Sequence, residues 1–111
     1  MSVKETDRID AMGVDEKTNT LVLLVIDPYT WMIQEMDHIL TLQKKINNYV
    51  GYIEGRGYAE KYPDRQFDGF RIEVAFRYQY SDNCRQVLEA GSQQLRDRGI
   101  DFAYSIVTTD E

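Results

Sequence analysis

Residues 31–57 read WMIQEMDHILTLQKKINNYVGYIEGRG, and apolar side chains recur in them at helical spacing for longer than anywhere else in the chain. At about 100° per residue, one face of a helix collects the apolar residues and the opposite face collects polar ones. The apolar set is Met32, Met36, Ile39, Leu40, Ile46, Val50 and Ile53, and the polar set is Asp37, Lys44, Lys45 and Asn48. The stretch therefore predicts one long amphipathic helix with its lysines opposite the core.

Start and stop signals bound this helix. Asp27 is a good N-cap with Pro28 tolerated in the first turn, and Thr30 is a competing cap. Gly55 and Gly57 offer the left-handed conformation of a C-cap. We therefore expect the helix to begin shortly after Asp27 and to end at these glycines.

Apolar runs on either side of the helix predict four strands. Residues 8–14 are expected to form a weak edge strand. Residues 21–26, LVLLVI, are apolar at both odd and even positions, as in the most buried strand of a sheet. Residues 70–80 alternate between apolar and polar, and residues 100–107 do so again after a second helix. That second helix is capped by Ser81 or Asp82 and closed by Gly99.

The resulting element order is β-β-α-β-α-β. The first two strands are joined by a short polar stretch that favours a hairpin, and the later strands alternate with helices. Right-handed crossovers would place both helices on the same face. The sequence predicts an α+β fold, a two-layer sandwich of a four-stranded mixed sheet with two helices on one face.

Composition bounds the class of protein. A chain of 111 residues predicts a single domain over residues 1–111, and its first six residues are polar and expected to be frayed. The lone Cys84 and the lack of a basic-then-apolar leader predict a cytoplasmic protein, and no segment has the apolar length of a membrane span. The net charge of −6 argues against nucleic acid and favours a basic protein or a small ligand as partner.

Candidate binding residues lie along the helix. Gln43 and Asn47 are one turn apart inside the apolar arc, and Glu54 follows two turns later. A buried amide without a hydrogen bond costs about 1–3 kcal/mol, so these groups need partners. Either they tie down residues 58–69 or a sheet edge, or they line a polar pocket under that long connection.

The long connection supplies further candidates. A dozen residues without secondary structure are disproportionately functional. Tyr58, Tyr62 and Phe67 in this connection are expected to be partly buried and to form a contact surface with the end of the helix. Packing back over the helix end is the alternative.

No catalytic or metal-binding motif is recognisable. His38 is the only histidine and lies at the border of the apolar face, which favours a residue that covers the core. Cys84 could be activated by the helix N-terminus, but its place on the apolar stripe favours a small buried hydrophobe. We expect no catalytic residue, no metal ligand and no cofactor, and an enzyme is less favoured than a binding domain.

Most of the chain, from about residue 8 to residue 100, resembles a family of small bacterial domains with no assigned function. The most specific part of the resemblance is the helix pattern, and it is supported by features before and after it. The residues concerned are Ile9, Asp10, Gly13, Asp27, Trp31, His38, Leu40, Leu42, Gln43, Lys45, Asn47, Tyr49, Ile53, Glu54, Gly55, Tyr62, Pro63 and the strand of residues 70–80. The resemblance implies a bacterial source and no particular activity.

A binding or interaction domain is the function that this sequence favours. Small size, acidic balance and eight tyrosines suit a protein that neutralises a toxin or regulates a neighbouring enzyme. The alternative is a small-molecule-binding domain or minor enzyme whose pocket is lined by Gln43, Asn47, Glu54 and the loop tyrosines.

Self-association is expected through the sheet. If both helices cover one face, Val22, Leu24 and Ile26 must point to the other, and such a patch suits a two-fold homodimer. Arg71, Glu73, Arg77 and Asp101 lie close enough to cover the patch with their side chains and leave a monomer.

Overall fold

The computed structural model describes residues 3–6, 8–31 and 34–107. Met32, one of the residues expected on the apolar face of the long helix, lies outside them. The predicted order of strands and helices is confirmed, with one short 3₁₀ helix added after the long helix. The elements are β1 (Ala11–Asp15), β2 (Thr20–Asp27), α1 (Glu35–Glu54), η1 (Gly57–Glu60), β3 (Gly69–Phe76), α2 (Asp82–Asp97) and β4 (Ile100–Ile106).

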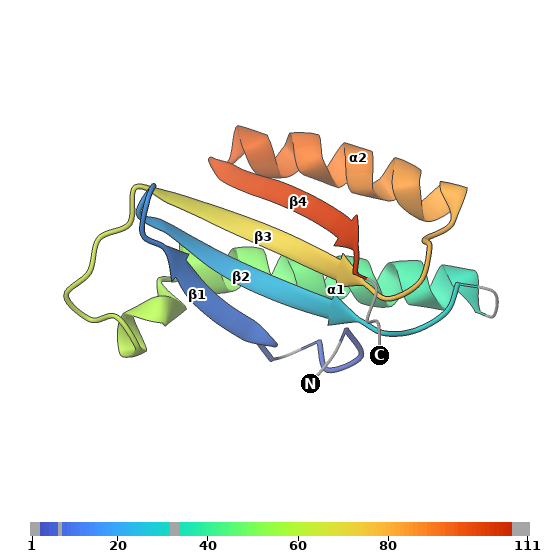
Figure 1. Cartoon of the computed structure of the whole chain (residues 1–111), viewed down its shortest axis with the longest axis horizontal. Coiled ribbons are helices and arrows are strands. Elements are labelled where there is room, and N and C mark those ends of the chain that lie inside the picture. The colour runs from blue at the N-terminus through green and yellow to red at the C-terminus, as the bar shows by residue number, and fades with distance from the viewer. Residues whose placement is uncertain (1–2, 7, 32–33, 108–111) are drawn as a thin grey trace.

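The sheet is mixed and its strand order is β1-β2-β3-β4. β1 and β2 form the predicted antiparallel hairpin, whereas β2, β3 and β4 run parallel to one another. In Figure 1, α1 passes behind β2 and β3, and α2 lies alongside β4. Because inward residues of both helices join one core with the same sheet face, this is the predicted two-layer α+β fold.

Alternation along the central strands decides which face is covered. Leu21, Leu23 and Val25 of β2 are fully buried against the helices, as are Ile72 and Val74, the β3 partners of Leu23 and Val25. Between them, Val22, Leu24 and Ile26 are half-buried on the opposite face. Every second residue of β2 therefore faces a side of the sheet that no helix covers in Figure 1.

The boundaries of α1 differ from the predicted ones. Asp27 ends β2, and the N-cap of α1 is Gln34, which has a left-handed φ of 57° and no side-chain capping bond. At the other end the left-handed residue is Arg56, with φ 59°, rather than either glycine. Asp27 does not cap the helix because its carboxylate is held by a side chain of α1, described below.

The rotation of α1 about its axis is also different. Lys45 is fully buried, whereas Met36 and Leu40 are 63% and 55% exposed. The prediction that Lys45 lies opposite the core, with Met36 and Leu40 in it, is wrong. The residues that α1 buries are Ile39, Leu42, Lys45, Tyr49, Val50 and Ile53.

The N-terminal arm lies against α1 and β2. Val3 is fully buried, and its N–H donates to the Ile26 carbonyl at 2.8 Å. Lys45 donates to the carbonyl of Glu5 at 2.8 Å, and Asn48 donates to the carbonyl of Thr6 at 2.6 Å. The prediction of frayed ends is therefore wrong for residues 3–6.

Candidate functional site

A buried polar cluster joins α1 to the sheet. Lys45 Nζ lies 2.6 Å from a carboxylate oxygen of Asp10, and both side chains are fully buried. The other oxygen of Asp10 accepts from Ile26 N–H at 2.8 Å. Tyr49 Oη accepts from Asp10 N–H at 2.8 Å and donates to the Leu24 carbonyl at 2.6 Å. Burial raises the pKa of Tyr49. Because the side chains of Asp10 and Lys45 are fully buried against each other, we interpret this cluster as a structural clamp.

A second clamp holds the other end of β2. Asp27 is fully buried, and its two carboxylate oxygens lie 2.7 and 2.8 Å from His38 Nε2. His38 Nδ1 lies 3.2 Å from the Thr30 carbonyl, and the Trp31 ring stacks on the imidazole at 3.5 Å between centroids. Each ring nitrogen of His38 thus faces an oxygen of another residue, Nε2 the Asp27 carboxylate and Nδ1 the Thr30 carbonyl. With its side chain only 8% exposed, His38 links α1 to the end of β2 and covers the border of the core, as predicted.

Cys84 lies in the same region of the core. It is fully buried, and burial, together with the carboxylates of Asp27 and Glu35, raises the pKa of its thiol to about 12. A thiol with this pKa is protonated near neutral pH and is a poor nucleophile. Among the described residues, no group of three or more histidine, cysteine or acidic side chains could hold a metal ion.

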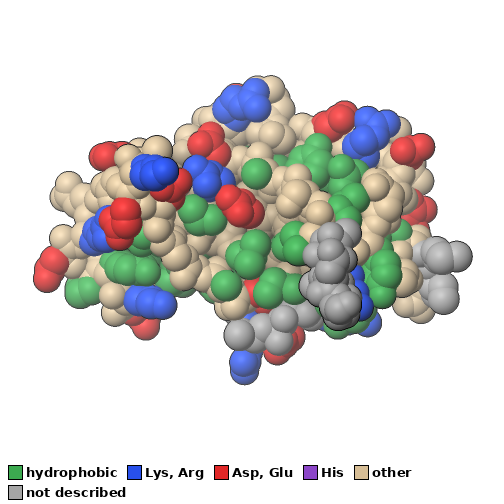
Figure 2. Space-filling view, in the orientation of Figure 1, with side chains coloured by type: hydrophobic (Ala, Val, Ile, Leu, Met, Phe, Trp, Pro, Cys, Tyr) green, Lys and Arg blue, Asp and Glu red, His purple; other side chains and the backbone are tan. Residues whose placement is uncertain are grey.

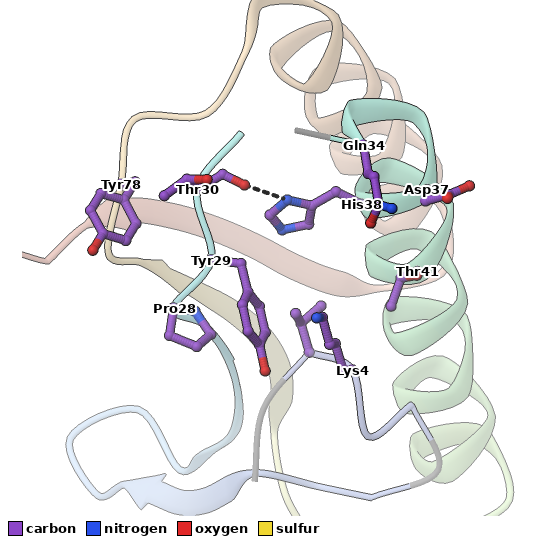
Figure 3. Close-up of a pocket in the computed structure, with 10 residues that line it drawn as sticks. Lys4, Pro28, Tyr29, Thr30, Gln34, Asp37, His38, Thr41 and Tyr78 are labelled. Carbon is purple, nitrogen blue, oxygen red and sulfur yellow. Dashed lines mark hydrogen bonds between the residues drawn. The ribbon is translucent and has the colours of Figure 1, made fainter. Parts of the chain in front are cut away.

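A cavity of about 620 Å³ opens at the carboxyl ends of β2 and β3. Figure 3 shows Lys4 and Tyr29 side by side in it, with the Lys4 ammonium 4.2 Å from the ring centroid. The cavity offers one lysine, one carboxylate, hydroxyls and an amide to any small molecule. Its lining residues are Val3, Lys4, Pro28, Tyr29, Thr30, Gln34, Asp37, His38, Thr41 and Tyr78.

A groove of about 590 Å³ lies between α1 and α2, and none of its sixteen lining residues is charged. The two half-exposed side chains Met36 and Leu40 belong to its α1 wall. On the α2 wall, a Cβ added to Gly91 would meet nothing within 4 Å. The lining residues are Met36, Ile39, Leu40, Leu42, Gln43, Ile46, Asn47, Asn83, Gln86, Val87, Leu88, Ala90, Gly91, Gln94, Leu95 and Phe102.

The open face of the sheet is more polar than the groove. Figure 2 shows hydrophobic side chains interspersed with acidic and basic ones on this face. Arg71 pairs with Glu73 at 3.2 Å and lies 3.9 Å from Asp15, and the strand register sets Asp101 beside Arg71. A shallow hollow near β1 includes Val22 and Leu24 but is bordered by Asp15 and Glu73.

The predicted binding residues on α1 do not meet at one site. Gln43 and Asn47 line the groove and are exposed to solvent. The prediction that they are buried amides is wrong, because the rotation of α1 turns them away from the sheet. Glu54 is exposed at the helix end, where both its oxygens lie 2.9 Å from Arg98 Nη1.

The loop aromatics form a cluster of their own. Phe67 lies 5.6 Å from Tyr58 and 5.5 Å from Tyr62, measured between ring centroids, and Tyr58 lies 5.4 Å from Phe70. Tyr62 and Phe67 are partly buried as predicted, but Tyr58 is only 8% exposed and belongs to the core. None of the three cavities described above is lined by these residues. The aromatic rings fill the space where a polar pocket was expected.

The α2 wall of the groove was missed by the sequence reasoning. Its signal is an uncharged stripe at helical spacing, in a helix whose other positions are rich in charge. The stripe consists of Asn83, Gln86, Val87, Ala90, Gly91 and Gln94. The strand-end cavity has a weaker signal, since only its position after two parallel strands could have suggested it.

Comparisons with known proteins support the predicted resemblance. In the described part of the chain, neither helix is both long enough and apolar enough to cross a membrane. No curated protein and no solved structure matches the chain. Residues 1–108 match the family described as Family of unknown function (DUF6572), and the chain therefore belongs to that family.

Proposed function

We propose that this protein is an interaction domain that binds a partner protein in the groove between α1 and α2. The observation that carries the proposal is the absence of charge from the sixteen lining residues in a chain that is 29% charged. Soluble surfaces normally mix charges of both signs. An uncharged, partly apolar groove that leaves Met36 and Leu40 in water is typical of a surface that another molecule covers.

The groove chemistry fits a helical segment of the partner. Apolar side chains at helical spacing on such a segment would fill a channel between two helices. Met36 can adapt its shape because its side chain is unbranched and flexible. Gln43 and Asn47 on one wall, with three further amides on the other, can exchange hydrogen bonds with the segment without the cost of desolvating a charge.

His38 and Cys84 are the strongest candidates for catalytic groups, and the surroundings of both favour binding over catalysis. Both ring nitrogens of His38 are engaged, one with Asp27 and one with the Thr30 carbonyl. The Cys84 thiol is buried, and its pKa is raised to about 12. Neither group is poised to attack or deprotonate a substrate.

Regulation of an enzyme or neutralisation of a toxin is the finer form of this proposal. The net charge of −6 would speed the arrival of a basic partner. The groove itself is neutral, so charge affects how fast the partner arrives, and the groove determines where it binds. Relief of growth arrest by co-expression with a toxic neighbouring gene would support this form, and failure to relieve it would remove it.

Site-specific photo-crosslinking in cells tests the groove. A benzoylphenylalanine in place of Leu40 should give a discrete adduct, because Leu40 lies in the groove wall. The matched control is the same residue in place of Lys44, which is exposed on α1 outside the groove. Equal adducts from both positions, or none from position 40, would contradict the proposal.

Small-molecule binding is the second candidate, and it is supported at the strand-end cavity. A volume of about 620 Å³ lies within the range of ligand pockets, and the lining mixes Lys4, Asp37 and several hydroxyls. A polar metabolite with both an anionic and a cationic or donor group suits these residues. A thermal-shift screen should find a stabilising metabolite whose effect is lost in Tyr78→Ala and kept in Leu40→Glu; a flat screen counts against this candidate.

A further inference from the structure

The Lys4 side chain places an ammonium group in the strand-end cavity. Its Nζ lies 4.2 Å from the centroid of the Tyr29 ring, and Figure 3 shows the two side chains next to each other. A cation within about 6 Å of a ring centroid is attracted by the face of the ring, and proteins use this contact to recognise ammonium groups of ligands. The cavity thus already holds one ammonium group, which the chain itself supplies.

The backbone around Lys4 is fixed, whereas its side chain is held weakly. Val3 is fully buried, and its N–H donates to the Ile26 carbonyl. On the other side, the carbonyl of Glu5 accepts from Lys45. Lys4 itself is exposed, and its ammonium forms no hydrogen bond or ion pair with the residues that the structure describes. Because an exposed contact between a cation and a ring is weak, rotation of this side chain can free the ring while the arm stays in place.

The rest of the cavity lining favours a cation. Apart from Lys4 and His38, Asp37 is the charged residue among the described residues that line it. The other polar side chains are hydroxyls and the amide of Gln34, whose oxygens can accept from an ammonium group. His38 lies against the Asp27 carboxylate, so this pair adds no net positive charge. The net charge of −6 also draws cations toward such a cleft.

A second pair of lysine and tyrosine shows what is particular to the cavity. Lys61 Nζ lies 6.0 Å from the centroid of the Tyr62 ring. Neither residue lines any of the three cavities described above. The contact between Lys4 and Tyr29 is shorter, and it lies in a cavity of about 620 Å³, which is large enough for a small ligand. Of the two pairs, this one combines a ring that holds an ammonium group with room for another molecule.

We infer that the strand-end cavity binds the ammonium group of a small organic amine, and that Lys4 occupies this site in the free chain as an internal competitor. The inference rests on the small-molecule candidate proposed above, since it names the ligand class and the regulation of the same cavity. The ammonium of the ligand takes the place of Lys4 on the Tyr29 ring, and Asp37 supplies the opposite charge. The N-terminal arm thereby lowers the affinity of the cavity without closing it.

Titration of the isotope-labelled full chain with n-butylammonium, followed by the NMR shifts of its amides, tests the inference. This probe has the four-carbon stem and the ammonium group of a lysine side chain. Lys4→Met should bind it about three- to tenfold more tightly than the wild type, because the variant removes both the competitor and its repulsion of the probe. Adding either Tyr29→Leu or Asp37→Asn should reverse this gain. Asp37 is exposed, so the second addition tests the site even if the first impairs folding.

Two controls separate the site from a general effect of charge. Lys61→Met makes the same substitution at the other pair and should bind the probe like the wild type. Pentanoate, which carries a carboxylate on the same four-carbon stem, should bind neither the wild type nor Lys4→Met. Equal binding of n-butylammonium by the wild type and Lys4→Met, a gain that neither added substitution reverses, or binding of pentanoate that Lys4→Met abolishes would overturn the inference.

The small-molecule candidate can survive the loss of this inference. A metabolite without an amine group that stabilises the wild type, and whose effect is lost in Tyr78→Ala, would keep the candidate and overturn the inference. A flat metabolite screen, together with no binding of n-butylammonium to Lys4→Met, would remove both.

Discussion

The two sides of α1 each carry residues that depart from the usual pattern of a surface helix. Toward the sheet, it buries His38 and Lys45, each beside a carboxylate. Toward the groove, it leaves Met36 and Leu40 63% and 55% exposed. A typical amphipathic helix turns charged side chains outward and apolar ones inward, and α1 follows that rule at its other buried positions. Polar side chains that are buried with fixed partners determine how the helix is rotated, and the apolar side chains left outside belong to the proposed binding groove.

The clamp of Asp10, Lys45 and Tyr49 explains why this rotation of α1 about its axis is stable. Turning α1 to bury Met36 and Leu40 would carry Lys45 into water and leave the Asp10 carboxylate without its cation. The same turn would move Tyr49 away from Asp10 N–H and the Leu24 carbonyl. A buried carboxylate that loses its cation costs several kcal/mol, which exceeds the gain from covering two side chains that are already half-covered.

Breaking the clamp of Asp10, Lys45 and Tyr49 should have the largest effect on stability. Lys45→Met should lower the free energy of unfolding by about 3–5 kcal/mol, because Asp10 would stay buried without its cation. Lys44→Met, at the exposed neighbouring position, should change it by less than about 0.5 kcal/mol. Urea denaturation of both variants measures the contrast. Equal effects would mean that the burial of Lys45 does not govern stability.

The sequence predicted the fold because its signals are local. The apolar run of residues 21–26 and the alternation after residue 70 mark the central strands, and the helix lies between them. The rotation of α1 could not be predicted in this way. A periodicity counts Lys45 as a surface residue, and it cannot detect that Asp10, 35 positions earlier, folds back to meet it.

A smaller but direct contrast comes from two leucines two positions apart on α1. Leu42→Ala should cost about 2–4 kcal/mol, because Leu42 is only 1% exposed and its loss leaves a cavity. Leu40→Ala should cost less than about 0.5 kcal/mol in chains dilute enough to be monomeric. Chemical denaturation at low protein concentration measures both. A larger cost for Leu40→Ala would show that Leu40 belongs to the core and not to the wall of the groove.

The candidate site was predicted only in part, because it depends on how distant elements meet. Gln43 and Asn47 were singled out as unusual and do line the groove, but for the wrong reason, since they are exposed. Their partner wall lies on α2, more than thirty positions later, and no local pattern links the two helices. Glu54 and the loop aromatics belong to other parts of the surface. The bacterial source and cytoplasmic location implied by the sequence stay predictions.

Cys84 is a buried ionisable group without an opposite charge, and it should make the stability of the protein depend on pH. The pKa of Cys84 is raised from 9.0 to about 12, so the folded chain holds this proton more tightly than the unfolded chain. Its contribution is fully present below pH 9 and is lost as the pH rises from about 9 toward 12, by at most about 1.4 kcal/mol per unit. The stability advantage of the wild type over Cys84→Ala should shrink from about pH 8 to about pH 10.5. A constant difference in urea denaturation would contradict the raised pKa.

The smallest effect is expected at the exposed ion pair between Glu54 and Arg98. The pair links the carboxyl end of α1 to the residue after α2, and its side chains are 49% and 56% exposed. Water screens such a pair, so Arg98→Ala should cost less than about 1 kcal/mol, and added salt should reduce that cost. A double-mutant cycle with Glu54→Ala, in low and high salt, isolates the interaction. A coupling energy above about 2 kcal/mol, unchanged by salt, would show that surface charges also fix the positions of the helices. The rotation of α1 could then no longer be attributed to its buried polar side chains alone.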